Sequence, residues 1–162
     1  MSTSTFIISI VIAALLGGAI GLEREYREKE AGFRTHFLVG LGSALFMILS
    51  AHAFDDVTAL PGVRLDPSRI AAQVVSGIGF IGAGTIIFQK HAVKGLTTAA
   101  GLWVTSAIGM TAGSGMYVLA ITATVLVLVC LEGMNFVHHR VFKHRHREYD
   151  ADEEEELTPK EQ

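Results

Sequence analysis

The residues with the greatest chemical capacity in this chain stand near the ends of long apolar segments. They are Glu23, Arg24, Glu25, Arg34, Thr35, His36, Arg69, Gln73, Lys94, Thr97 and Thr98. Charged, amide and hydroxyl groups in such positions can form the mouth of a pathway or a surface that binds a partner or ligand. The simpler alternative is that they cap helix ends, and Lys94, Thr97 and Thr98 are expected to start the fourth helix. We call this set the polar cluster, and the sequence leaves both interpretations open.

Three pairs of opposite charge follow the first apolar segment at a spacing of four residues. The pairs are Glu23 with Arg27, Arg24 with Glu28, and Glu25 with Lys29. Residues four apart are neighbours on a helix surface, so this spacing predicts that the first helix continues through the charged stretch. Gly32 is then predicted to break the helix before Arg34 leads into the second segment.

Five apolar stretches position these residues. They are approximately Phe6–Leu22, Phe37–Phe54, Ile70–Phe88, Leu96–Ala112 and Met116–Met134. A helix rises about 1.5 Å per residue, so roughly 17–25 apolar residues cover a hydrocarbon core of about 30 Å. Half of the residues are hydrophobic, and the mean hydropathy is positive. Because lipid requires backbone polar groups to be satisfied within each segment, we predict an all-α membrane protein, a bundle of five transmembrane helices.

The distribution of positive charge predicts the orientation of this bundle. Eleven of the 13 Lys and Arg residues follow the first and third segments or lie in the C-terminal tail, whereas Arg64 and Arg69 lie on the other side. Cytoplasmic loops carry an excess of Lys and Arg. The N-terminus is therefore predicted outside and the C-terminus in the cytoplasm, and an odd number of helices agrees with this placement.

The chain is predicted to divide into one transmembrane domain, residues 1–142, and a charged cytoplasmic tail, residues 143–162. The tail is too polar to bury a core and is expected to be disordered. A histidine-rich stretch joins the two, and it contains His138, His139, His144 and His146. These histidines could sense a metal ion or pH, or they could join the neighbouring Lys and Arg as an anchor at the anionic leaflet.

Small residues recur within the apolar segments and predict close helix packing. They are Gly17, Gly21, Gly77, Gly79, Gly82, Gly84, Gly101, Thr105, Gly109 and Gly113. Small side chains let membrane helices approach closely, within a chain or across a dimer. Ile108 lies off the small-residue face of the fourth segment and is expected to tolerate Leu. Residues 77–82 also match G-x-G-x-x-G, but the βαβ context of a dinucleotide site is missing, so packing is the better interpretation.

The middle of each apolar segment contains few polar residues and no charged ones. Gln73 lies about one turn into the third segment, where its amide is expected to be buried among the helices. Glu132 lies near the inner end of the fifth, and no charged residue stands near a midpoint. Transport pathways usually place ionisable groups there. The sequence also has no Ser–Lys pair, His-Glu-x-x-His motif or paired intramembrane aspartates. We therefore expect no enzymatic activity, no metal site and no cofactor.

Four ordered motifs, Gly21–Glu25, Ala31–His36, Arg69–Gly84 and Gly95–Trp103, resemble those of the MgtC/SapB family of bacterial membrane proteins. The similarity extends from about Phe6 to Met134. It covers the transmembrane domain, without the ACT-like domain that the best-known members carry after the fifth helix. The resemblance implies a multi-pass protein of the bacterial cytoplasmic (inner) membrane that is linked to growth at low Mg²⁺ and, in some members, to survival in host cells. It also implies action on other membrane machinery, including the proton-translocating ATP synthase.

Two functions stay open at this stage. The first is a non-catalytic regulator or accessory of other membrane machinery in Mg²⁺ homeostasis and in adaptation to low Mg²⁺ or envelope stress. The second is an oligomeric transporter of Mg²⁺ or another divalent cation, with its pathway at a subunit interface. The missing midpoint carboxylates favour the first function. The expected partners are the lipid bilayer, a membrane protein and further copies of the chain, but no nucleic acid.

Overall fold

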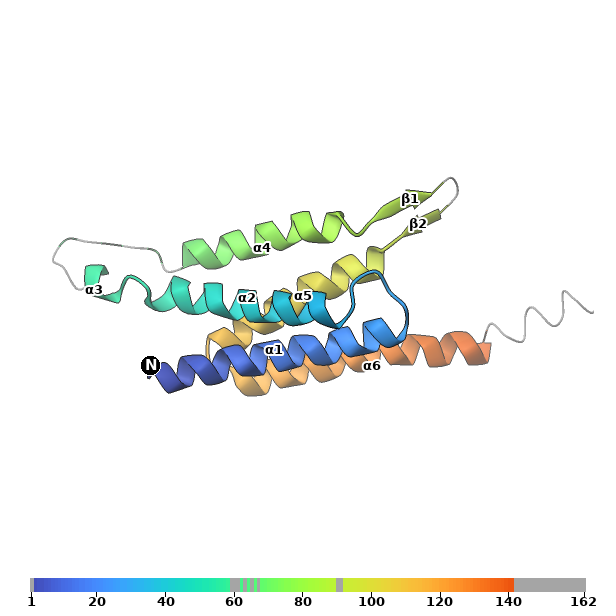
Figure 1. Cartoon of the computed structure of the whole chain (residues 1–162), viewed down its shortest axis with the longest axis horizontal. Helices are drawn as coiled ribbons and strands as arrows, with labels where there is room; N and C mark the ends of the chain where they lie inside the picture. The colour runs from blue at the N-terminus through green and yellow to red at the C-terminus, as the bar shows by residue number, and fades with distance from the viewer. Residues whose placement is uncertain are drawn as a thin grey trace, which may run out of the picture. The chain divides into compact units, whose positions relative to one another are not determined.

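Helices make up most of the described chain. The structure, a computed structural model, describes residues 2–58, 62, 64, 66, 68–89 and 92–141. Its elements in chain order are α1 (Thr3–Tyr26), α2 (Phe33–His52), α3 (Asp55–Thr58), α4 (Ser68–Ala83), β1 (Ile87–Gln89), β2 (Ala92–Lys94), α5 (Leu96–Gly113) and α6 (Tyr117–Val141) (Figure 1). The predicted helical architecture is confirmed for these residues, with one short hairpin that the sequence did not predict.

Two described helices, α1 and α2, are long and apolar enough to cross a membrane. The whole of α4 and the Tyr117–Gly133 part of α6 are shorter apolar helices. The 16 residues of α4 extend over about 24 Å, which is less than a hydrocarbon core of about 30 Å. The third predicted segment is therefore shorter than expected, because its helix ends at Ala83 and not at Phe88.

A hairpin takes the place of the missing end of that segment. The backbone N–H and the hydroxyl of Thr85 both donate to the Gly82 carbonyl, at 3.0 and 2.8 Å, and so close α4. The strands β1 and β2 then pair antiparallel, with Ile87 opposite Lys94. Gly95 starts α5 with a φ of +89°, and a Cβ there would overlap the Thr85 carbonyl oxygen. A short apolar run such as residues 86–88 has no clear period, so the sequence could not separate strand from helix.

The first helix also ends earlier than its charge spacing predicted. Of the three predicted pairs, Glu23 with Arg27 forms, with 3.6 Å between Oε1 and Nε. Beyond Tyr26 the chain leaves the helix, and Glu28 has a φ of +53°. The first helix thus continues past the apolar segment, as predicted, but it does not include Glu28 and Lys29, because the chain must turn here to begin α2.

The helices α1, α2 and α5 pack against one another, and α4 packs on α2 and α5. Glycines bring their backbones into contact: Gly17 faces the His36 carbonyl, Gly40 the Ala13 carbonyl, Gly109 the Gly40 carbonyl and Gly113 the Ala44 carbonyl. An added Cβ at any of these glycines would overlap the facing oxygen. Ile20, Leu102 and Ile108 fill the core beside these contacts and are at most 2% exposed. Close backbone approach is the means by which helices associate where the surrounding medium is itself apolar.

The chain divides into two units, Met1–Val125 and Leu126–Gln162, with the boundary inside α6. In the first unit, a hydrogen bond of 2.8 Å between the hydroxyls of Tyr117 and Ser9 joins the start of α6 to α1. In the second unit, the described residues continue α6 with exposed Leu126 and Val129. The predicted tail, with His144 and His146, lies outside the described residues, as do the side chains of His138 and His139.

Candidate functional site

Part of the polar cluster gathers around the loop that joins α1 to α2. His36, in the first turn of α2, is fully buried between α1 and α5. Its Nδ1 lies 3.0 Å from the Gly32 carbonyl oxygen, while Nε2 has no hydrogen-bond partner among the described residues. Gly21 on α1 and Gly101 on α5 leave room for the ring, since an added Cβ would lie 2.9 Å from His36 Cβ and 3.5 Å from Nε2, respectively.

Arg24 is the second buried ionisable residue at this end of the helices. Its side chain lies at the last turn of α1, 5% exposed, with Nη1 3.5 Å from Glu23 Oε2. Its Nε has no hydrogen-bond partner within the described part of the chain. Buried polar atoms are normally satisfied by protein or ordered water. The orphan nitrogens of Arg24 and His36 give this region the capacity to hold a water molecule or a small polar ligand.

Two glutamates fix the loop in place. Glu25 Oε2 accepts the Phe33 backbone N–H at 2.7 Å, so a side chain from α1 caps the start of α2. Glu30 Oε2 accepts the Thr98 hydroxyl at 2.8 Å and thereby joins the loop to α5. The carboxylate of Glu30 also accepts its own backbone N–H, and these two hydrogen bonds lower the pKa of Glu30 below its ordinary value. We call Glu23, Arg24, Glu25, Glu30, His36 and Thr98 the helix-end cluster.

Sequence reasoning missed Glu30. It ends a run of alternating charges, and such runs usually lie in solvent. The signal that could have identified it is its place directly before Ala31 and the helix-breaking Gly32, where a carboxylate can reach a neighbouring helix. Nothing local indicates its partner, because Thr98 is 68 residues away in the sequence.

Other members of the polar cluster lie apart from the helix-end cluster. Arg69 and Gln73 are exposed on α4, although Gln73 was expected to be buried among the helices. Lys94 was expected to begin a helix with Thr97, but it is exposed on β2, and α5 begins at Leu96. Thr97 is also exposed. These predictions fail because α4 is covered on one side only and because a hairpin occupies the residues before α5.

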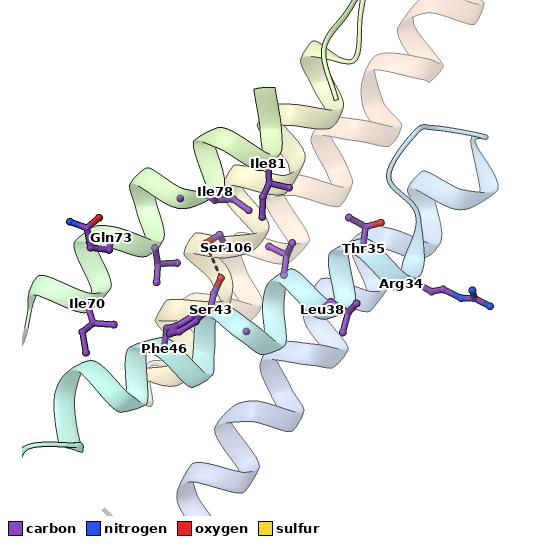
Figure 2. A pocket seen from close by; sticks show the side chains of 14 residues that line it. Arg34, Thr35, Leu38, Ser43, Phe46, Ile70, Gln73, Ile78, Ile81 and Ser106 are labelled. Atoms are coloured by element: carbon purple, nitrogen blue, oxygen red, sulfur yellow. Dashed lines mark hydrogen bonds between the residues drawn. The ribbon is translucent and has the colours of Figure 1, made fainter. Parts of the chain in front are cut away.

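An open groove of about 630 Å³ runs between α2 and α4, with α5 beneath it. Its lining is mostly apolar and consists of Arg34, Thr35, Leu38, Val39, Gly42, Ser43 and Phe46 of α2, Ile70, Gln73, Val74, Gly77, Ile78 and Ile81 of α4, and Ser106 of α5. Figure 2 shows the hydroxyls of Ser43 and Ser106 pointing toward each other on the floor, and their oxygens are 2.8 Å apart. Arg34 stands at one end with its guanidinium directed away from the groove (Figure 2).

The family model of the MgtC family matches residues 10–140. This chain belongs to the MgtC family. It is 54% identical over 147 residues to "Putative magnesium transporter YhiD" of Escherichia coli (strain K12), an alignment that covers 91% of this chain and 67% of YhiD. It is 43% identical over 123 residues to "Protein MgtC" of Salmonella typhimurium (strain LT2), covering 76% of this chain and 49% of that protein. No solved structure is significantly similar to it.

The range that matches the MgtC family contains the whole polar cluster and the small-residue positions. On α5, the structure places Gly101, Thr105, Gly109 and Gly113 on a buried face. Thr105 satisfies its hydroxyl within the helix by donating to the Gly101 carbonyl at 2.8 Å. On α1, Gly17 and Gly21 face the first turn of α2, and on α4 an added Cβ at Gly82 would lie 3.5 Å from the Ala99 carbonyl oxygen.

Three glycines of the predicted third segment, two in α4 and one directly after it, do not serve the predicted packing within the described chain. An added Cβ at Gly77 or Gly79 would meet nothing within 4 Å, and one at Gly84 would meet only carbonyl oxygens of the preceding turn. The physical reason is that α4 contacts its neighbours with one face. The expectation that Ile108 tolerates Leu was also wrong in its premise, because Ile108 is 2% exposed and belongs to the core.

Proposed function

We propose that this MgtC-family protein is a bacterial inner-membrane protein of Mg²⁺ homeostasis that regulates other membrane machinery without catalysing a reaction. We propose five membrane-crossing helices, with the N-terminus outside and the C-terminus in the cytoplasm. Family membership and the names of its relatives support the link to Mg²⁺ and to the membrane. The distribution of Lys and Arg supports the orientation.

The observation that carries the regulatory role is the fixed loop of the helix-end cluster. Glu25 holds the loop to α2, and Glu30 holds it to α5. A surface that is ordered before binding loses less conformational entropy when a partner docks. The exposed charge of Arg34, directly after this loop, is therefore presented on a preformed surface at the proposed cytoplasmic end.

Thr98→Val tests this role, because it removes the hydroxyl that holds Glu30 and keeps a similar shape. We expect Thr98→Val to abolish complementation of a low-Mg²⁺ growth defect while its level in the membrane stays normal. Thr97→Val is the matched control, since Thr97 is the neighbouring exposed threonine. Growth equal to wild type in both variants would show that the fixed loop is scaffolding.

The second candidate function is transport of Mg²⁺ by a homo-oligomer. It is favoured by the groove between α2 and α4, because a second copy placed over it could enclose a pathway with hydroxyls on its floor. The name of YhiD also supports a transport function. Purified protein in liposomes loaded with a Mg²⁺-sensitive dye separates the two functions. A flux that Ser43→Val abolishes would support transport, and its absence alongside normal complementation would support regulation.

A further inference from the structure

We propose that the groove between α2 and α4 binds one acyl chain of an anionic phospholipid from the cytoplasmic leaflet, with the lipid phosphate at Arg34. The proposal rests on the membrane placement proposed above and goes beyond it by assigning a ligand to the groove. It does not depend on whether the protein regulates or transports.

The chemistry of the groove fits an apolar guest. Leu38, Phe46 and Ile81 supply apolar walls from α2 and α4. The polar groups of the floor, Ser43 and Ser106, share one hydrogen bond of 2.8 Å between their hydroxyl oxygens, so each oxygen has a partner. A guest that brings no hydrogen-bonding groups therefore leaves no buried polar atom unpaired, whereas a hydrated cation would find little to replace its water.

The length of the groove fits a single acyl chain. From Arg34 to Phe46, the groove follows α2 for twelve residues, which corresponds to about 18 Å along a helix. One leaflet contributes roughly half of a hydrocarbon core that is about 30 Å thick. A chain in this groove would thus run from the proposed cytoplasmic surface to the region of the bilayer midplane.

The charge at the ends of the groove selects the headgroup. Arg34 is exposed at the proposed cytoplasmic end, and its guanidinium is directed away from the groove (Figure 2), so a phosphate bound there would lie outside the groove that holds the acyl chain. A guanidinium binds phosphate oxygens through charge-assisted hydrogen bonds. The cytoplasmic leaflet holds the anionic lipids. Toward the opposite end, Gln73 and Ile70 carry no charge, so the groove has one cationic end and one neutral end.

Two glycines allow the groove to be filled without disturbing the fold. Gly42 on α2 and Gly77 on α4 line it, and an added Cβ at either position would meet nothing within 4 Å. A leucine at Gly77 would occupy the space of the acyl chain. Gly79 is equally open, lies on the same helix and is not part of the lining, so Gly79→Leu is a matched control.

The test is native mass spectrometry of the full chain in detergent, with added phosphatidylglycerol or phosphatidylcholine of identical acyl chains. We expect wild type to retain one phosphatidylglycerol and to prefer it over phosphatidylcholine about tenfold. Both lipids carry a phosphate, but the choline ammonium of phosphatidylcholine is repelled by Arg34, whereas phosphatidylglycerol has a net negative charge. Gly77→Leu and Gly42→Leu should lose retention of both lipids, and Gly79→Leu should keep it. Arg34→Gln should lose the preference, whereas Arg69→Gln at the other end of α4 should keep it.

Circular dichroism of each variant verifies that the helices are folded. Retention of phosphatidylglycerol by folded Gly77→Leu and Gly42→Leu at the wild-type level would overturn the proposal. The proposal would also be overturned if wild type were a dimer and if these variants became monomers that still retained lipid. That result would assign the groove to a second copy of the chain. Lipid retention is measured independently of complementation and of Mg²⁺ flux. The proposed function can therefore fail while the lipid proposal stands, and the reverse is also possible.

Discussion

Glu30 and His36 show how single residues organise the end of this bundle. Glu30 joins the loop between α1 and α2 to α5 through the Thr98 hydroxyl. His36 fills the space that glycines on α1 and α5 leave open. One is an exposed carboxylate and the other a fully buried imidazole. Their contacts come from three helices, so a change at either residue should alter how those helices meet.

The lowered pKa of Glu30 predicts that its contact weakens in acid. A carboxyl whose pKa is depressed on folding stabilises the folded state above its unfolded pKa, and this contribution is lost as the pH falls through the folded value. We expect amide exchange in the loop, corrected for the intrinsic rate, to increase as the pH falls below the ordinary value of 4.5. Thr98→Val should reduce this pH dependence and Thr97→Val should retain it. An unchanged profile in Thr98→Val would contradict the prediction.

Among the elements, α5 is closely packed against its neighbours. Its small residues lie against α2, and Ile108 and Leu102 are buried with them. In contrast, α4 contacts α2 and α5 with one face and leaves Phe80 85% exposed. The difference explains why glycines are required on α5 and why Gly77 and Gly79 of α4 have free space beside them.

Gly109→Leu should separate α5 from α2, because an added side chain overlaps the Gly40 carbonyl. Overpacking of this kind typically costs about 1–3 kcal/mol, and contact with backbone allows less relief than contact with a side chain. We expect a lower unfolding temperature in detergent and a lower yield in the membrane. Ala107→Leu is the control, since Ala107 is exposed on the same helix. Equal stability of the two variants would show that this face does not hold the helices together.

For the whole molecule, the proposed orientation assigns each end of the bundle to one side of the membrane. Arg34, Lys94 and the loop of the helix-end cluster then lie at the cytoplasmic side, and α3 lies outside. Asp66 closes the loop before α4 by accepting the backbone N–H and the hydroxyl of Ser68, at 2.9 and 2.6 Å, and these bonds lower the pKa of Asp66. Asp66 thereby caps the start of α4.

Reporter fusions test the orientation directly. Fusions after Thr5, Gly62 and Gly115 should report an external location, and a fusion at the C-terminus should report the cytoplasm, because eleven of the 13 Lys and Arg residues are assigned to the inner side. A single fusion that reports the opposite side would reject the proposed topology. The level of each fusion in the membrane serves as the control for proteins that are not inserted.

The sequence by itself determined the helical architecture, the family and the approximate positions of the helices. These follow from properties that are local along the chain: apolar length, small-residue spacing and ordered motifs. It did not determine that α1 ends at Tyr26, that a hairpin follows α4, or that Glu30 binds Thr98. Only the tertiary structure decided these. Glu30 meets a threonine 68 residues away, and the short runs at the end of α1 and after α4 have no period that separates helix from turn or strand. The groove between α2 and α4 is also a feature that only the tertiary structure decided, since residues from separate segments line it.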